Sequence, residues 1–173
     1  MQYLIDQARV FPARAAAHGL DLGGRTHGRR PRALFISCSD ARIVPALLTG
    51  SRPGDLFELR TYGGLIPRFH PQKPTGESRT IDHAVRDLDV TDIIVCGHSH
   101  CEITDAALDE GDPSVQTSAG QRHIVSQLDV LSGYPCVTPR LADRSLRLHA
   151  WFYEVDTGAT LQYQPHASAF LPL

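Results

Sequence analysis

The fold is most evident at residues 33–38, where the sequence reads Ala33-Leu34-Phe35-Ile36-Ser37-Cys38. Pro31 precedes this apolar run and the polar pair Ser39-Asp40 follows it, a pattern that predicts a short strand buried on both faces. A second run, Ile93 to Cys96, is rich in β-branched residues and is bounded by Gly97. We therefore expect two strands that lie in the middle of a sheet.

Helical and strand patterns alternate along the rest of the chain. The spacing of apolar residues and the positions of glycine and proline predict one or two short helices at 2–19, a helical turn at 43–48, helices at 80–88 and 124–131, strands at 56–60, 146–152 and 160–163, loops at 68–76 and 111–120, and a break at 135–139. This order predicts an α/β fold with a mainly parallel central β-sheet flanked by helices and an antiparallel C-terminal edge strand or hairpin.

The length and charge of the chain limit its organisation and its partners. A length of 173 residues with 42% hydrophobic residues predicts a single domain over 1–173, in which 1–30 form an N-terminal helical arm and loop and 31–173 form the α/β core. The formal net charge of -2 gives no electrostatic basis for binding nucleic acid or an anionic membrane surface, and favours a small-molecule partner. No apolar run approaches the roughly 20 residues of a membrane helix, so we expect a cytoplasmic protein.

The four cysteines have to be judged separately. In a reducing cytosol, metal binding or simple burial is favoured over disulfide formation. Cys96 lies within an expected strand and Cys136 in a proline-flanked turn, so both are interpreted as small buried side chains. Cys38, taken alone, is equally consistent with burial and with metal binding.

Two of the expected strands end at side chains that bind metal ions. Cys38 closes the first strand, and His98 stands just past the end of the second, three residues before Cys101. Open α/β sheets bind ligands outside the carboxyl ends of their strands, so the three side chains should face one crevice. Two thiolates and one imidazole suit zinc and leave its fourth position vacant, as in catalytic zinc sites. We expect one Zn²⁺ per chain at Cys38, His98 and Cys101.

Asp40 and Arg42 follow Cys38 at two-residue intervals and could form a charge-assisted bidentate pair beside the metal. An Asp40 held ionised by Arg42 only accepts hydrogen bonds, so it would orient a zinc-bound hydroxide. If Arg42 swung away, Asp40 could instead bind the zinc. A purely structural ion pair is the alternative for these two residues. His100 is expected to be a surface or supporting residue rather than a fourth ligand.

At these residues the sequence resembles the β-class carbonic anhydrases. That family's pattern is Cys-x-Asp-x-Arg, then Gly-Asp-Leu-Phe, then Gly-His-x-x-Cys, and the same order is present here at 38–42, 54–57 and 97–101. The resemblance covers most of the chain, from about Phe11 through Leu108 and again at 124–131 and 146–158.

The resemblance implies a fold, a reaction and an assembly. It implies zinc bound by Cys38, His98 and Cys101, with Asp40 and Arg42 as the catalytic pair. The implied reaction is the reversible hydration of carbon dioxide to bicarbonate and a proton, by attack of zinc-bound hydroxide. The implied assembly is a homodimer or a higher homo-oligomer.

The sequence departs from the family pattern in three places. Where the family usually has Arg-Asn-Ala-Gly-Asn, this chain has Arg60-Thr61-Tyr62-Gly63-Gly64, which removes two amide side chains and adds an aromatic ring near the pocket. Glu102 replaces the glycine that usually follows the second cysteine and brings a carboxylate close to the metal or to a helix start, where a carboxylate is favourable. The stretch at 109–121 is shortened, which would open the cleft or alter the dimer contact.

Two other functions are consistent with the same residues. A related zinc hydrolase of carbonyl sulfide or carbon disulfide would be favoured by the altered wall at 62–64. A zinc-binding or regulatory protein without turnover would follow from the changes at Glu102 and 109–121. Hydration also needs a group that carries the released proton to solvent, and because histidine titrates near neutrality, His70, His83 and His100 are candidates.

Overall fold

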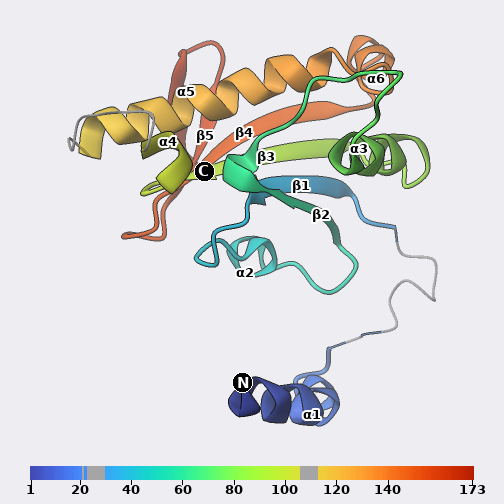
Figure 1. Ribbon diagram of the computed structural model, residues 1–173, viewed down its shortest axis with the longest axis vertical. Coiled ribbons are helices and arrows are strands. Elements are labelled where there is room, and N and C mark those ends of the chain that lie inside the picture. Colours follow the sequence, from blue (N-terminus) through green and yellow to red (C-terminus); the bar gives the residue numbers. More distant parts are fainter. Residues whose placement is uncertain (21, 23–29, 106–112) are drawn as a thin grey trace.

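A six-stranded sheet forms the centre of the structure, a computed structural model that describes residues 1–20, 22, 30–105 and 113–173. The strand order is β2-β1-β3-β4-β5-β6. The first four strands in this order run parallel, and β5 and β6 are antiparallel to their neighbours. The expected mainly parallel sheet with an antiparallel C-terminal hairpin is confirmed (Figure 1). The strands are β1 (Ala33–Cys38), β2 (Leu56–Thr61), β3 (Asp92–His98), β4 (Arg147–Tyr153), β5 (Thr160–Gln164) and β6 (Ala169–Pro172).

Helices cover both faces of the sheet. One face packs against α3, α5 and α6, and the other packs against the short α2, while α1 lies apart from the sheet in Figure 1. None of the helices in the described ranges is both long and apolar enough to cross a membrane. The helices are α1 (Gln2–Ala17), α2 (Pro45–Thr49), α3 (Gly76–Arg86), α4 (Glu102–Asp105), α5 (Pro113–Ser132) and α6 (Thr138–Ala142), with a 3-10 turn, η1, at Tyr62–Gly64.

The two central strands are buried because their side chains alternate between two apolar layers. Leu34 and Ile36 of β1 pack in the layer beneath α3 and α5, whereas Phe35 packs in the layer that Leu48 of α2 covers. All six residues of β1 are buried, as the uninterrupted apolar run predicted. The carboxyl ends of β1 and β3 therefore have a fixed position relative to each other.

A close contact sets the height of α5 above the sheet. Gly97 of β3 has no side chain, and a Cβ atom at that position would lie 2.4 Å from Cγ1 of Ile124 on α5. That separation is far inside van der Waals contact, so only glycine lets α5 approach β3 this closely. Because Gly97 precedes His98, the same contact places α5 over the metal-ligand region.

Several boundaries differ from the sequence predictions. The loop expected at 111–120 is wrong from residue 113 onward, since α5 begins at Pro113 and runs unbroken to Ser132. Proline is compatible with the first turn of a helix, where its missing N–H has no partner to lose. The break expected at 135–139 contains the start of α6, the helix at 2–19 is continuous through Pro12, and β6 was missed.

Candidate metal centre

The three predicted metal ligands meet at the carboxyl ends of β1 and β3. Cys38 is the last residue of β1, and His98 is the last residue of β3 rather than the first residue after it. His100 then takes a left-handed φ of +55°, which turns the chain so that Cys101 comes back toward His98. The two sulfur atoms and a ring nitrogen of His98 lie within 4.8 Å of one another, and all three residues are buried.

The hydrogen bonding of His98 fits a metal ligand. Its Nδ1 lies 2.9 Å from the carbonyl oxygen of Ser99, and because a carbonyl only accepts, Nδ1 is the donor. The neutral ring then has its lone pair on Nε2, which is buried and has no hydrogen-bond partner among the described residues. A metal-bound histidine usually has this arrangement. The hydrogen bond from the ring nitrogen that does not bind the metal fixes both the tautomer and the orientation of the ring. With two thiolates beside it, the donor set suits zinc.

The other two cysteines lie elsewhere in the fold. None of the four cysteines, all of them in the described ranges, forms a disulfide. Burial raises the pKa of Cys96 to about 12 and the pKa of Cys136 to about 11. Both thiols therefore stay protonated at neutral pH, and a protonated thiol is a poor metal ligand. The interpretation of these two residues as small buried side chains agrees with their exposed fractions of 0% and 5%.

Asp40 and Arg42 form the bidentate pair that their spacing predicted. Arg42 donates from Nε to Oδ1 at 3.0 Å and from Nη2 to Oδ2 at 2.6 Å, and the backbone N–H of Arg42 also donates to Oδ1 at 2.8 Å. The hydrogen bonds from Arg42 hold the pKa of Asp40 well below its usual range, so Asp40 is a carboxylate at neutral pH. Its Oδ2 lies 4.0 Å from Nε2 of His98, which places the pair beside the three ligands.

A further arginine shapes the loop that carries this pair. Arg60, the penultimate residue of β2, donates to the carbonyl oxygens of Cys38 at 3.1 Å, Asp40 at 2.6 Å and Ile43 at 2.8 Å. The loop after β1 therefore wraps around one guanidinium group, whose several N–H donors suit this arrangement. Sequence reasoning missed this role, although a charged residue near the end of an apolar strand was a usable signal.

The candidate proton carriers take different positions in the structure. His100 lies beside the site, with its backbone carbonyl accepting from Arg42 at 2.8 Å and its Nε2 2.7 Å from Oδ2 of Asp156. His83 lies on α3 and pairs with Asp87, the residue that follows the helix. His70 lies in an exposed loop. Of the three, His100 is therefore the histidine that contacts the predicted site residues.

The segment that departs from the family pattern borders the site. Gly63 and Gly64 both have left-handed φ angles, and a Cβ atom on Gly63 would lie 2.9 Å from Cγ2 of Ile103. Tyr62 is 74% exposed, so it forms no part of the buried core. Glu102 is the first residue of α4, as its helix-start interpretation predicted, while most of the shortened stretch at 109–121 lies outside the described residues or in α5.

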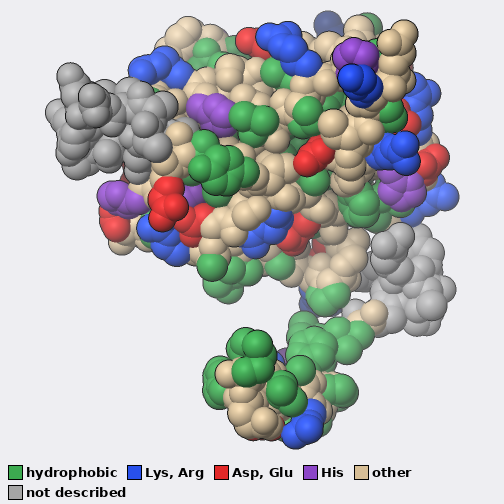
Figure 2. Space-filling view, in the orientation of Figure 1, with side chains coloured by type: hydrophobic (Ala, Val, Ile, Leu, Met, Phe, Trp, Pro, Cys, Tyr) green, Lys and Arg blue, Asp and Glu red, His purple; other side chains and the backbone are tan. Residues whose placement is uncertain are grey.

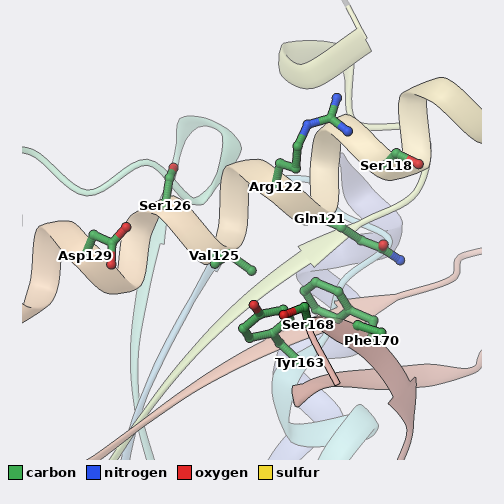
Figure 3. A pocket seen from close by; sticks show the side chains of 10 residues that line it. Ser118, Gln121, Arg122, Val125, Ser126, Asp129, Tyr163, Ser168 and Phe170 are labelled. Atoms are coloured by element: carbon green, nitrogen blue, oxygen red, sulfur yellow. The ribbon is translucent and has the colours of Figure 1, made fainter. Parts of the chain in front are cut away.

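A groove lies away from Cys38, His98 and Cys101. It has a volume of about 580 Å³ and runs between α5 and the C-terminal strands. Figure 3 shows Gln121 and Val125 of α5 above Tyr163 and Phe170. No predicted site residue lines this groove. A hollow of about 260 Å³ borders Arg42, with Val44, Leu47 and Tyr153 in its wall.

The fold and the site together define an α/β protein with a buried Cys-His-Cys cluster that could hold a metal ion at the carboxyl ends of its parallel strands. The family model described as carbonic anhydrase matches residues 33–120. A carbonic anhydrase from Pseudomonas aeruginosa is 35% identical over 157 residues, covering 74% of this chain and 71% of that protein. A carbonic anhydrase from Synechocystis is 33% identical over an alignment that covers 94% of this chain and 71% of that protein.

Solved structures agree with these relationships. The β-carbonic anhydrase CcaA superposes with a TM-score of 0.91 at 30% identity, over 100% of this chain and 99% of that one. A tetrameric β-carbonic anhydrase from Sordaria macrospora has a TM-score of 0.80 over 93% of this chain and 95% of its own, and at 22% identity it shows likeness of fold alone. The chain belongs to the β-carbonic anhydrase family.

Proposed function

We propose that this chain catalyses the reversible hydration of carbon dioxide to bicarbonate and a proton, with zinc bound by Cys38, His98 and Cys101. The observation that supports the proposal best is the buried Nε2 of His98, which has no hydrogen-bond partner in the described structure and lies with two thiols in one cluster. A zinc ion there would act as a Lewis acid that makes water nucleophilic near neutral pH.

The protein side chains would provide orientation and charge. Asp40, kept ionised by Arg42, only accepts hydrogen bonds, so its carboxylate would orient a proton-bearing oxygen in the pocket and disfavour a second acceptor there. Arg42 is itself anchored on the carbonyl oxygen of His100 at 2.8 Å. These contacts hold Asp40 in a single orientation, and a fixed acceptor lowers the cost of ordering the reactants.

A stopped-flow assay of carbon dioxide hydration tests the function. We expect zinc-loaded wild-type protein to accelerate hydration, and Asp40→Asn, which keeps the shape of the side chain but loses the charge, to reduce kcat/KM by about 100-fold or more. Cys38→Ser is the control, because it lacks one of the three proposed zinc ligands. If wild-type protein that contains stoichiometric zinc hydrates carbon dioxide no faster than Cys38→Ser, the proposal is contradicted.

We also propose that the chain forms a homodimer or a larger homo-oligomer. The support is α1, which lies apart from the sheet and exposes apolar side chains that a solvated helix would not favour, as Figures 1 and 2 show. Tyr3 is 70% exposed, Leu4 63% and Val10 51%. A second copy of the chain would bury this surface.

A further inference from the structure

The segment from Gly63 to Ile66 lies beside the candidate metal centre and is held only in part by its own hydrogen bonds. The backbone N–H of Leu65 donates to the carbonyl oxygen of Tyr62 at 3.2 Å, and Oγ1 of Thr61 donates to the carbonyl oxygen of Leu65 at 2.9 Å. Gly63 and Gly64 are consecutive and have φ angles of +68° and +69°. Glycine has more conformational freedom than any other residue, and neither residue has a side chain that could anchor it. The carbonyl oxygen of Gly63 and the N–H of Ile66 are bonded instead by groups from another part of the chain.

Two side chains of α5 hold this segment. His123 donates from Nε2 to the carbonyl oxygen of Gly63 at 3.1 Å. The backbone N–H of Ile66 donates to Oε1 of Gln127 at 2.9 Å, and Gln127 is only 6% exposed. His123 and Gln127 are four residues apart, so they lie on the same face of α5. The helix thus contacts the segment near both of its ends.

The segment in turn contacts the residues around the metal ligands. A Cβ atom on Gly64 would lie 3.7 Å from the backbone nitrogen of Cys38, which is van der Waals contact. A Cβ atom on Gly63 would lie 2.9 Å from Ile103, which follows Cys101 by two residues. A displacement of the segment would therefore be transmitted to the surroundings of both cysteine ligands.

The position of α5 itself is fixed independently. Ile124, the neighbour of His123, packs on Gly97 at the distance that only glycine permits. Gly97 is the neighbour of the ligand His98. The donor of His123 is thus held at a set height over the end of β3.

We propose that His123 and Gln127 are positioning residues that hold Gly63 to Ile66 in the shape that packs against the backbone of Cys38 and the side chain of Ile103. The effect of this role on turnover rests on the proposed carbonic anhydrase function. The effect on the segment does not, because it follows from the two hydrogen bonds alone.

The test compares His123→Ala with His123→Gln, whose side-chain amide can still donate to the carbonyl oxygen of Gly63. Asp129→Ala, an exposed substitution on the same helix, is the control for changes in α5. Gln127 is not substituted, because loss of a buried hydrogen-bonding side chain can unfold the whole protein. Three quantities are measured on each protein: zinc content, hydrogen exchange of the amides at 64–66, and kcat and KM for carbon dioxide hydration.

For His123→Ala we expect unchanged zinc content, faster exchange at 64–66, and a kcat/KM about tenfold lower, the effect of losing one hydrogen bond that orients the segment. His123→Gln should recover most of both effects, and Asp129→Ala should resemble the wild type.

Two results would overturn the proposal. The first is wild-type exchange at 64–66 in His123→Ala. The second is a lower melting temperature with faster exchange but normal kcat/KM in the zinc-loaded protein, which is what a purely structural role predicts. If wild-type protein itself shows no hydration, the proposed function fails, and exchange in the alanine and glutamine variants still decides whether His123 holds the segment.

Discussion

At the scale of single residues, the site depends on which atoms the surrounding chain leaves available. The hydrogen bond of His98 Nδ1 to Ser99 leaves the lone pair of Nε2 available to a metal ion. Burial leaves the thiols of Cys96 and Cys136 protonated, whereas Cys38 and Cys101 face His98. The same residue type therefore has two different roles in one chain, and the difference comes from the position of each side chain and not from its chemistry.

This difference predicts the metal content of cysteine variants. Cys38→Ser should lose nearly all bound zinc, because a serine hydroxyl is not deprotonated at neutral pH and is a poor zinc ligand. Cys136→Ala, which also removes a buried thiol, should keep about one zinc ion per chain. Atomic absorption on the purified variants measures both. Equal zinc content in Cys38→Ser and wild type would contradict the ligand assignment.

At the scale of secondary structure elements, the site depends on how closely elements approach one another. The height of α5 is set at Gly97, and the pairing of β3 with β4 is reinforced by Asp92, which accepts from Arg147 and His149 at 2.8 Å each. Both contacts join segments that are distant in the sequence. A change at either position should therefore affect stability more than an equivalent change at the surface.

Gly97→Ala should destabilise the protein by about 1–3 kcal/mol, because the new methyl group would overlap Ile124 and force α5 away from β3. Gly76→Ala is the matched control, since a Cβ atom there would meet nothing within 4 Å. Urea unfolding of the two variants measures the difference. Equal unfolding midpoints for Gly97→Ala and wild type would show that α5 can move without cost.

Asp92 predicts a pH dependence of stability. Burial raises its pKa, but the hydrogen bonds from Arg147, His149 and Thr91 outweigh burial, so the pKa of the folded state lies below that of the unfolded state. Its stabilising contribution is therefore present above the unfolded-state pKa of about 4 and is lost as the pH falls further.

Asp92→Asn should thus be less stable than wild type by about 1–3 kcal/mol at pH 6, with the gap closing below about pH 4. Unfolding midpoints across this range measure the gap. Asp82→Asn, which removes an exposed partner of Arg86, should stay within about 0.5 kcal/mol throughout. A gap for Asp92→Asn that is constant with pH would mean that the charge of Asp92 is unimportant.

At the scale of the whole molecule, α1 lies apart from the sheet and leaves apolar side chains exposed. Its exposed Tyr3, Leu4 and Val10 have no apolar layer to join within the described part of the chain. If they are covered by a second copy, the mass in solution should exceed the 19.0 kDa of one chain.

Leu4→Glu should shift the protein toward the monomer by at least tenfold in dissociation constant, because a buried carboxylate without a partner is costly. Arg9→Gln is the control, since Arg9 is exposed and forms an ion pair with the exposed Asp6 on the same helix. Sedimentation velocity measures the mass of each. Identical masses for wild type and Leu4→Glu would exclude α1 from the interface.

The amino-acid sequence by itself determined β1, β3 and the class of the fold, because these depend on local apolar runs and their order. The grouping of Cys38 with the distant pair His98 and Cys101 was also predictable, because both expected strands end at these side chains and the carboxyl ends of parallel strands share one edge of the sheet. The pairing of Asp40 with Arg42 was evident from their short spacing within one segment.

Only the tertiary structure decided the positions that depend on contacts between distant segments. Arg60 holds the loop after β1, and His123 and Gln127 reach Gly63 and Ile66 from some 60 residues away in the chain. The fold also formed β6 and extended α5 through a stretch whose glycines and proline suggested a loop. In each case the stabilising contact exists only after the chain has folded, so a local pattern such as the charge of Arg60 near a strand end could not indicate the partner.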